Sequence, residues 1–192
     1  VMAYAPTNDD DALKITDNTL TSGSKDAGVY MPSLNSLKNG WHELKPGGRT
    51  SCSRGSQFSF FFKRGKDTSK VILEFMGGGA CWNKLTCGLR TSTFNENIEG
   101  IRSLWLNGRD SVPPDYDQPA GQSTFAFNSG IEDPSAPTFK DWSHIYIPYC
   151  TGDLHWGDND VEYLPDLKIR HRGAVNAGAA VEWMVKNFVE PE

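Results

Sequence analysis

The sequence predicts an α/β fold in which an antiparallel hairpin leads into parallel strands with flanking helices. Its apolar residues follow two periods, and these alternate along the chain. Short apolar runs typical of strands stand at 58–63, 71–75 and 144–150, and helical spacing is found at 96–106 and 170–189. Such alternation is typical of crossovers between parallel strands of one sheet.

Bulk composition indicates a single, loop-rich domain. The chain has 192 residues, of which 19 are glycine and 11 are proline, and 11% are aromatic. This length allows a sizeable core, and the aromatic content argues against disorder. The net charge of −5 disfavours a nucleic-acid partner. We also expect no membrane span, because no apolar run reaches the ~20 residues that a bilayer requires.

Residues 1–40 are expected to form a polar N-terminal arm with one short strand near 29–31. Residues 1–11 lack the basic and apolar regions of a signal peptide, as in a fragment or in a mature form whose signal was removed. The acidic run Asp9–Asp11 predicts a solvated surface. A calcium loop is the alternative, but the glycine and glutamate spacing of such loops is missing.

Three consecutive glycines, Gly77–Gly79, end the apolar strand at 71–75. Without Cβ atoms the backbone can present bare N–H groups at the carboxyl edge of a sheet, where α/β folds place their sites. A dinucleotide fingerprint would need glycine in place of Trp82, and a phosphate loop would need Gly-Lys-Ser or Gly-Lys-Thr, which is absent. The remaining match is the oxyanion loop of esterases. The alternative is a tight turn under a disulfide.

The first strands are expected to pair as a hairpin. Residues 58–63 alternate with strand period, residues 64–70 form a polar turn, and residues 71–75 return as the second strand. The segment 107–141 is irregular and contains five prolines. A run of this length without regular structure is either functional or disordered, and its apolar anchors favour an ordered loop near the site.

Two helices are predicted. The first covers Glu96–Leu106, with Trp105 in the core rather than serving as a ligand platform. The second covers Arg170–Val189 and ends before Pro191. Its apolar face is expected to comprise Val175, Ala179, Val181, Met184, Val185 and Phe188.

A second strand and loop repeat the arrangement of the first. The strand at 144–150 carries Pro148 near its end, where a lost N–H is tolerated, and the loop 151–158 follows it. Parallel strands bring their loops to the same edge of a sheet. We therefore expect Gly77–Gly79 and Asp153–Trp156 to face one crevice.

Four cysteines, Cys52, Cys81, Cys87 and Cys150, indicate disulfides in an oxidising compartment, and hence a secreted, extracellular or periplasmic protein. Four cysteines allow three pairings. No Cys-x-x-Cys pair occurs, which disfavours structural zinc and thioredoxin-like redox chemistry.

An ordered series of motifs runs from Gly40 to the end of the chain. It comprises Gly40-Trp41, Thr50-Ser-Cys-Ser-Arg-Gly55, Gly77-Gly-Gly-Ala-Cys-Trp82 with Cys87, Ile147-Pro-Tyr-Cys-Thr-Gly-Asp153, His155-Trp-Gly157, and His171-Arg-Gly173 with Asn176. In order and spacing these motifs resemble the pectin acetylesterase/Notum family. Several ordered blocks together are more specific than any single motif.

The resemblance implies an α/β-hydrolase fold and a Ser-His-Asp carboxylesterase without a cofactor, in which Gly78 and Gly79 supply oxyanion N–H groups. The family's serine lies in a Gly-x-Ser-Ala-Gly elbow after the helix that matches 174–189, and no Gly-x-Ser-x-Gly occurs in this sequence. Residues 41–192 are therefore expected to be the N-terminal half of the domain, inactive alone. The triad is expected on a C-terminal segment or a second chain.

No residue of this sequence is expected to act as nucleophile or catalytic base. Ser53 and Ser123 lack the strand–turn–helix context of a nucleophile. None of the four histidines matches the family's base.

The resemblance further implies removal of acetyl groups from a polysaccharide. Candidate substrate-binding residues are Trp82, Asp153, His155 and Trp156, with Trp156 as a wall or sugar platform. The alternatives are a buried Asp153 that accepts loop N–H bonds and a surface His155. A metal held by Asp153, His155, Asp158 and Asp160 is a minor interpretation that the resemblance does not require. Arg172 is expected to make a structural ion pair.

Two further hypotheses complete the interpretation. We predict the disulfides Cys81–Cys87, closing the loop after the oxyanion turn, and Cys52–Cys150, tying the hairpin to the next strand, all at one edge of the sheet. The alternative function is a non-catalytic carbohydrate-binding or interaction module that kept the fold and lost the chemistry.

Overall fold

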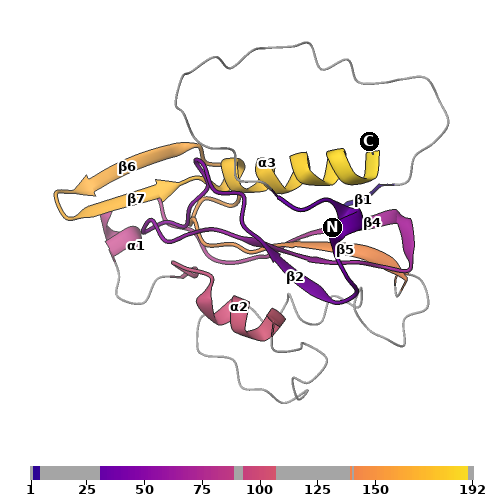
Figure 1. The fold of residues 1–192 in the computed structure, drawn as a ribbon. Helices are drawn as coiled ribbons and strands as arrows, with labels where there is room; N and C mark the ends of the chain where they lie inside the picture. Colours follow the sequence, from indigo (N-terminus) through magenta and orange to yellow (C-terminus); the bar gives the residue numbers. More distant parts are fainter. Residues whose placement is uncertain (1, 5–30, 89–92, 107–138, 140, 190–192) are drawn as a thin grey trace, which may run out of the picture.

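The computed structural model describes residues 2–4, 31–88, 93–106, 139 and 141–189 (Figure 1). In chain order, the elements are β1 (Met2–Tyr4), the 3-10 turn η1 (Leu34–Ser36), β2 (Trp41–Leu44), β3 (Phe60–Lys63), β4 (Asp67–Phe75), α1 (Lys84–Gly88), α2 (Glu99–Leu106), β5 (Trp142–Ile147), β6 (Asn159–Leu164), β7 (Leu167–His171), α3 (Gly173–Met184) and the π-helical turn η4 (Val185–Val189).

The strands form a five-stranded mixed sheet in the order β1-β4-β5-β3-β2, and β6 and β7 form a separate two-stranded ribbon. Strands β4 and β5 are parallel, whereas β1, β2 and β3 run antiparallel to their neighbours. The predicted α/β fold class, with antiparallel and parallel strands in one sheet and flanking helices, is confirmed.

The predicted hairpin between 58–63 and 71–75 is wrong, because β5 lies between β3 and β4. The antiparallel partner of β3 on its other side is β2. The connection from β3 to β4 crosses the start of β5 at Gly65, whose N–H donates to Ser143 Oγ over 3.1 Å. A Cβ at Gly65 would collide with the backbone of 141–143, so this crossing requires glycine.

Helices cover both faces of the sheet, with α3 on one side and α2 on the other (Figure 1). On the α3 side, the rings of Phe60 and Phe62 pack on Trp183, with centroid distances of 5.9 and 4.9 Å. Burying one such ring stabilises the fold by about 1.5–3 kcal/mol. These contacts join α3 to the buried cluster, which also includes Ile145 and Ile147 of β5 and Ile101 of α2.

On the α2 side the sheet carries charged groups. Arg102 Nε of α2 donates to Glu43 Oε1 of β2 over 2.7 Å, and Ser59 Oγ donates to the same oxygen. Burial raises the pKa of Glu43, but the Ser59 and Arg102 hydrogen bonds outweigh it and hold that pKa below its usual value. Deeper in the sheet, His144 Nε2 and Glu74 Oε2 are 2.8 Å apart and both side chains are buried. The sequence analysis did not foresee this pair.

The last helix begins later than predicted. Residues 167–171 pair with β6 instead, so α3 starts at Gly173. Its buried residues are Gly173, Asn176, Ala180 and Trp183. Of the predicted apolar face, Val181, Met184 and Phe188 are partly buried and pack against the core. Helix α2 starts at Glu99, three residues after the predicted start.

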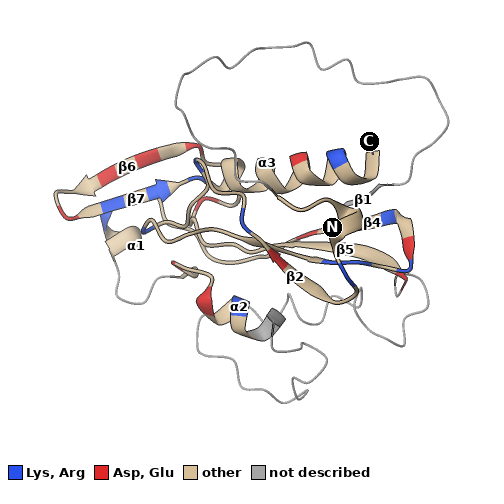
Figure 2. Cartoon of the chain, in the orientation of Figure 1, with Lys and Arg blue, Asp and Glu red and all other residues tan. Residues whose placement is uncertain are grey.

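The ribbon of β6 and β7 projects from the body and was not predicted (Figure 1). Its signal was present, because Pro165 and Asp166 separate two short runs with strand alternation. Strand β6 carries acidic residues and β7 carries basic residues (Figure 2). The predicted structural ion pair of Arg172 is confirmed, since its Nε and Nη2 donate to Asp160 over 2.8 and 2.9 Å.

Several expectations fall outside the described residues. These are the acidic run at 9–11, most of the strand near 29–31 and the ordered loop at 107–138. Within the described part of the chain, none of the helices has the length and apolar character that crossing a membrane would require.

Asn176 joins α3 to the segment before β3, and its replacement tests that link. Its Oδ1 accepts from Ser51 N–H over 3.1 Å and its Nδ2 donates to Ser51 O over 3.0 Å, both buried. Asn176→Ala leaves two buried backbone groups unpaired, so urea unfolding should show a loss of about 2–4 kcal/mol. The matched control on the same helix is Gly178→Ala, whose Cβ meets nothing and which should gain about 0.5–1 kcal/mol. Equal effects of the two variants would contradict this role.

Candidate functional site

The glycine turn follows directly on the last ladder bond of β4. Met76 N–H donates to Ile147 O over 2.9 Å, and the chain then enters Gly77–Gly79. The ring of Tyr149, just past β5, lies against Gly78, where an added Cβ would stand 2.5 Å from its Cδ1 atom. The close approach of ring and backbone therefore requires glycine at position 78.

The two predicted oxyanion donors differ in the structure. The Gly79 N–H donates to Thr93 O over 2.9 Å, so it is already engaged, and the oxyanion role of Gly79 stays a prediction. Within the described residues, the Gly78 N–H has no acceptor, and Gly78 is exposed. The single amide of Gly78 remains as the candidate donor.

Asp153 organises the second loop. Its Oδ1 accepts from Thr151 Oγ1 and His155 N–H over 2.6 and 3.1 Å. Its Oδ2 accepts from Gly157 N–H and Gly173 N–H over 3.1 and 2.7 Å. Four donors occupy the acceptor capacity of one carboxylate. These bonds match the alternative of the sequence analysis, in which Asp153 accepts loop N–H bonds, and substrate contact by Asp153 stays a prediction.

The Asp153 carboxylate also caps the N-terminus of helix α3. Gly173 is the first residue of α3, and Arg172 before it provides no side-chain cap. The first N–H groups of a helix lack internal acceptors and attract negative charge. Asp153, twenty residues earlier, thus caps α3 from the loop after β5.

His155 points back to the glycine turn instead of standing on the surface. Its Nε2 lies 3.0 Å from Met76 O. Its ring is 5.2 Å from that of Phe75 and 4.8 Å from that of Tyr149, measured between centroids. Burial lowers the pKa of His155 below its usual value, against smaller opposing effects of the Met76 carbonyl and Asp153.

Leu154 and His155 both adopt left-handed backbone conformations, with φ of 59° and 63°. Such residues are uncommon and persist where their surroundings hold them. Here Leu154 N–H donates to Tyr149 Oη over 2.7 Å. Burial raises the pKa of Tyr149 to about 12, so this hydroxyl stays protonated at neutral pH.

The two predicted loops do meet at one edge of the sheet. Cys81 N–H donates to Gly152 O over 2.9 Å, and His155 and Tyr149 contact Met76 and Gly78 as described above. The disulfides Cys52–Cys150 and Cys81–Cys87 are present at this same edge, which confirms the predicted pairing.

Two tryptophans stand exposed on these loops. Trp82 is 68% exposed and Trp156 is 84% exposed. Gly77 and Gly78 of the glycine turn are exposed as well. Leu85 of α1 and Leu154 of the second loop are also more than half exposed.

The other polar candidates are engaged or buried. Ser53 is fully buried, which removes it as a nucleophile open to substrate. The grouping of Cys81, Cys87 and His171 could geometrically hold a metal. Both sulfurs are spent in a disulfide, and His171 uses Nδ1 on Thr151 O and Nε2 on Tyr163 Oη. This grouping therefore does not favour a metal ion.

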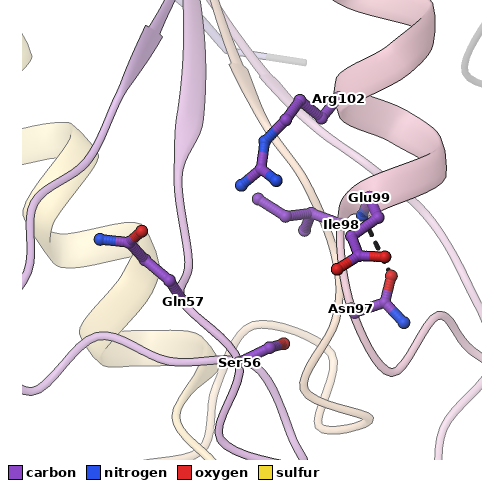
Figure 3. A pocket seen from close by; sticks show the side chains of 6 residues that line it. All are labelled: Ser56, Gln57, Asn97, Ile98, Glu99 and Arg102. Carbon is purple, nitrogen blue, oxygen red and sulfur yellow. Dashed lines mark hydrogen bonds between the residues drawn. The ribbon is translucent and has the colours of Figure 1, made fainter.

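A small polar cavity of about 160 Å³ lies near the start of α2 (Figure 3). Its lining residues are Ser56, Gln57, Asn97, Ile98, Glu99 and Arg102. Arg102 is neutralised by Glu43, and Glu99 adds a negative charge, so the lining does not favour an anionic ligand. None of its residues belongs to the glycine turn or to the Asp153 loop.

Three residues that sequence reasoning missed shape the site: Tyr149, Thr151 and Met76. Tyr149 and Thr151 lie inside the motif Ile147–Asp153, so the sequence analysis singled out their segment but not their roles. The roles of Tyr149 and Met76 depend on contacts between segments more than seventy residues apart, which no local pattern shows.

Comparisons with known proteins give a partial likeness. No protein-family model matches the chain, and none of the curated proteins matches it. Two solved structures of the Wnt deacylase Notum from Drosophila, crystal forms I and II, are similar, with 18% and 17% sequence identity and TM-scores of 0.42 and 0.44. The matches cover 78% of this chain but only 37% and 38% of the Notum chains. Neither family membership nor activity follows from likeness of this strength.

Replacing Asp153 tests its role as organiser. Asp153→Asn keeps the shape of the side chain but replaces one accepting oxygen by an NH₂ group. This NH₂ group then faces two of the hydrogen-bond donors that the oxygen had accepted from. Chemical unfolding should show a loss of about 2–5 kcal/mol. Asp166→Asn, in the exposed turn of the β6–β7 ribbon, is the matched control and should change stability by less than about 0.5 kcal/mol. A small effect at Asp153 would show that the loop holds itself.

Acidification tests the neutral state of His155. Its folded-state pKa lies below its usual value of 6.5, so the unfolded chain takes up this proton first as the pH falls. The contribution of neutral His155 to the free energy of unfolding is complete above the pKa of the unfolded state. It is lost as the pH falls through the pKa of the folded state. Unfolding free energies measured from pH 7.5 to 5 should fall more steeply for the wild type than for His155→Phe. Parallel curves would contradict a neutral, desolvated imidazole.

Proposed function

We propose that this chain supplies one oxyanion donor and the substrate-facing loops of a serine carboxylesterase that removes acetyl groups from a polysaccharide. The observation that carries the proposal is the Gly78 N–H. It is exposed at the carboxyl edge of parallel strands, without an acceptor among the described residues. Such an amide suits an oxygen that becomes negative during ester cleavage.

The chemistry divides between this chain and a further segment. A serine in a Gly-x-Ser-x-Gly elbow, absent from this sequence, attacks the ester carbonyl and forms a tetrahedral intermediate. Gly78 N–H donates to the oxyanion, and the amide after the serine supplies the second donor of such sites. Because Gly79 is bound to Thr93, the turn itself contributes one donor in this conformation.

The substrate class rests on the exposed tryptophans. Trp82 and Trp156 present flat apolar surfaces to solvent on the two loops that meet beside the turn. Isolated exposed aromatic rings on a site rim suit ligands with one apolar face and several hydroxyl groups, as sugar rings have.

Secretion follows as part of the proposal. Both disulfides are formed, and the described cysteines include no free thiol. Disulfides persist in oxidising compartments. An extracellular or periplasmic location also places the protein where polysaccharides are found.

The proposal is tested by hydrolysis of p-nitrophenyl acetate. The 192-residue chain alone should be inactive, and a chain extended through a Gly-x-Ser-x-Gly segment and the remaining triad should be active. In the active chain, Gly78→Ala should lower kcat about 10²–10³-fold, because its Cβ meets Tyr149 and displaces the amide. Gly178→Ala on the exposed side of α3 is the control and should leave kcat unchanged. Activity of the short chain that survives replacement of Ser53 and Ser123 would contradict the mechanism.

A second candidate function is non-catalytic sugar binding. The exposed Trp82 and Trp156 favour it independently of any nucleophile. Affinity electrophoresis in gels containing acetylated pectin or xylan distinguishes the two. Retardation that is lost in Trp82→Ala and Trp156→Ala, together with no esterase activity in the extended chain, would favour the binding module.

A further inference from the structure

His155 makes the bond that follows the end of the β4–β5 ladder. The last ladder bond runs from Met76 N–H to Ile147 O. On the same residue, the carbonyl oxygen of Met76 lies 3.0 Å from His155 Nε2. A carbonyl oxygen only accepts hydrogen bonds, so Nε2 carries the proton and donates it. The His155 imidazole therefore supplies the donor that a backbone N–H of β5 would supply if the ladder continued.

This bond fixes the direction of the amide that opens the glycine turn. Met76 O and Gly77 N–H belong to one planar trans peptide group, in which the carbonyl and the N–H point in opposite directions. Holding Met76 O toward the β5 side holds Gly77 N–H toward the other side. The Gly78 amide begins from this fixed plane. Glycines have the largest conformational freedom of all residues, so a turn of three glycines needs such an external restraint.

The imidazole is itself held rigidly. Its ring stands edge-on to Phe75 and tilted over Tyr149. The backbone N–H of His155 donates to Asp153 Oδ1 over 3.1 Å. The left-handed conformations of Leu154 and His155 turn the chain back toward β4. Backbone conformations of this kind cost of order 1–3 kcal/mol each and are found where a site over-determines them.

From this geometry we propose that His155 is a positioning residue of the glycine turn, which acts by donating its Nε2 proton to the Met76 carbonyl and thereby orients the Gly77 and Gly78 amides. The proposal deepens the proposed esterase function and rests on it for its catalytic meaning. The orientation of the Met76–Gly77 peptide group by His155 can be tested without any measurement of catalysis.

The sequence allows this peptide group to be observed alone. Met76–Gly77 is the single Met–Gly pair in the chain. Labelling methionine carbonyls with ¹³C and glycine amides with ¹⁵N therefore gives one cross-peak in an HNCO spectrum of the 192-residue protein. The carbonyl shift reports the hydrogen bond, and the amide shift reports the orientation of Gly77 N–H.

Two variants separate the donated proton from the shape of the side chain. His155→Phe keeps a ring between Phe75 and Tyr149 without a donor, and its carbonyl signal should move upfield. His155→Gln retains an N–H donor of similar reach, and its signal should return toward that of the wild type. In the wild type, long-range ¹H–¹⁵N correlation should show the neutral tautomer with the proton on Nε2. This last measurement needs no variant and stands even where His155→Phe fails to fold.

The outcomes distinguish this inference from the proposed function. Equal displacement of the cross-peak by both variants, or a wild-type proton on Nδ1, would overturn the positioning role. In the esterase-competent chain, His155→Phe should lower kcat about 10–100-fold with KM unchanged, and His155→Gln should recover most of the loss. A loss that glutamine does not rescue would also overturn it. If the spectra are as expected but the extended chain has no esterase activity, the positioning role of His155 is supported and only the proposed function is rejected.

Discussion

The Asp153 carboxylate is the interaction on which the site depends. It gathers Thr151, His155, Gly157 and Gly173 around two oxygens. The two glycines are obligatory, because a Cβ at either would press on that carboxylate. Hydrogen bonds to a charged group contribute about 1.5–3 kcal/mol each. One side chain thus shapes the loop, caps α3 and sets His155 in reach of the neighbouring strand.

Local pattern was sufficient for the parts of the fold that short-range chemistry determines. The buried strands β4 and β5 were evident from apolar runs, and three glycines marked where β4 must end. Because parallel strands deliver their loops to a common edge, the meeting of Gly77–Gly79 with Asp153–Trp156 could be anticipated. The two predicted cysteine pairs are both formed.

Long-range partners account for what the sequence did not show. Strand β5 enters between β3 and β4 after a gap of more than sixty residues, and no local signal distinguishes this from a hairpin. The direction of an N–H group is likewise invisible in sequence. Gly78 and Gly79 read alike as glycines, yet one amide meets Thr93 O and the other meets no acceptor among the described residues. Asp153 illustrates the same point for side chains, since a carboxylate in a loop suits either ligand or scaffold until its donors are seen.

The Cys52–Cys150 bond encloses 98 residues of separation in one covalent ring. The glycine turn, the smaller Cys81–Cys87 ring and all of α2 lie on its circumference. A protease that cuts once within this ring opens it without releasing a fragment, and both pieces travel together until a reductant divides them. During synthesis the ring also cannot close before Cys150 has left the ribosome, so the edge that carries the turn is sealed late, by the strand that completes it.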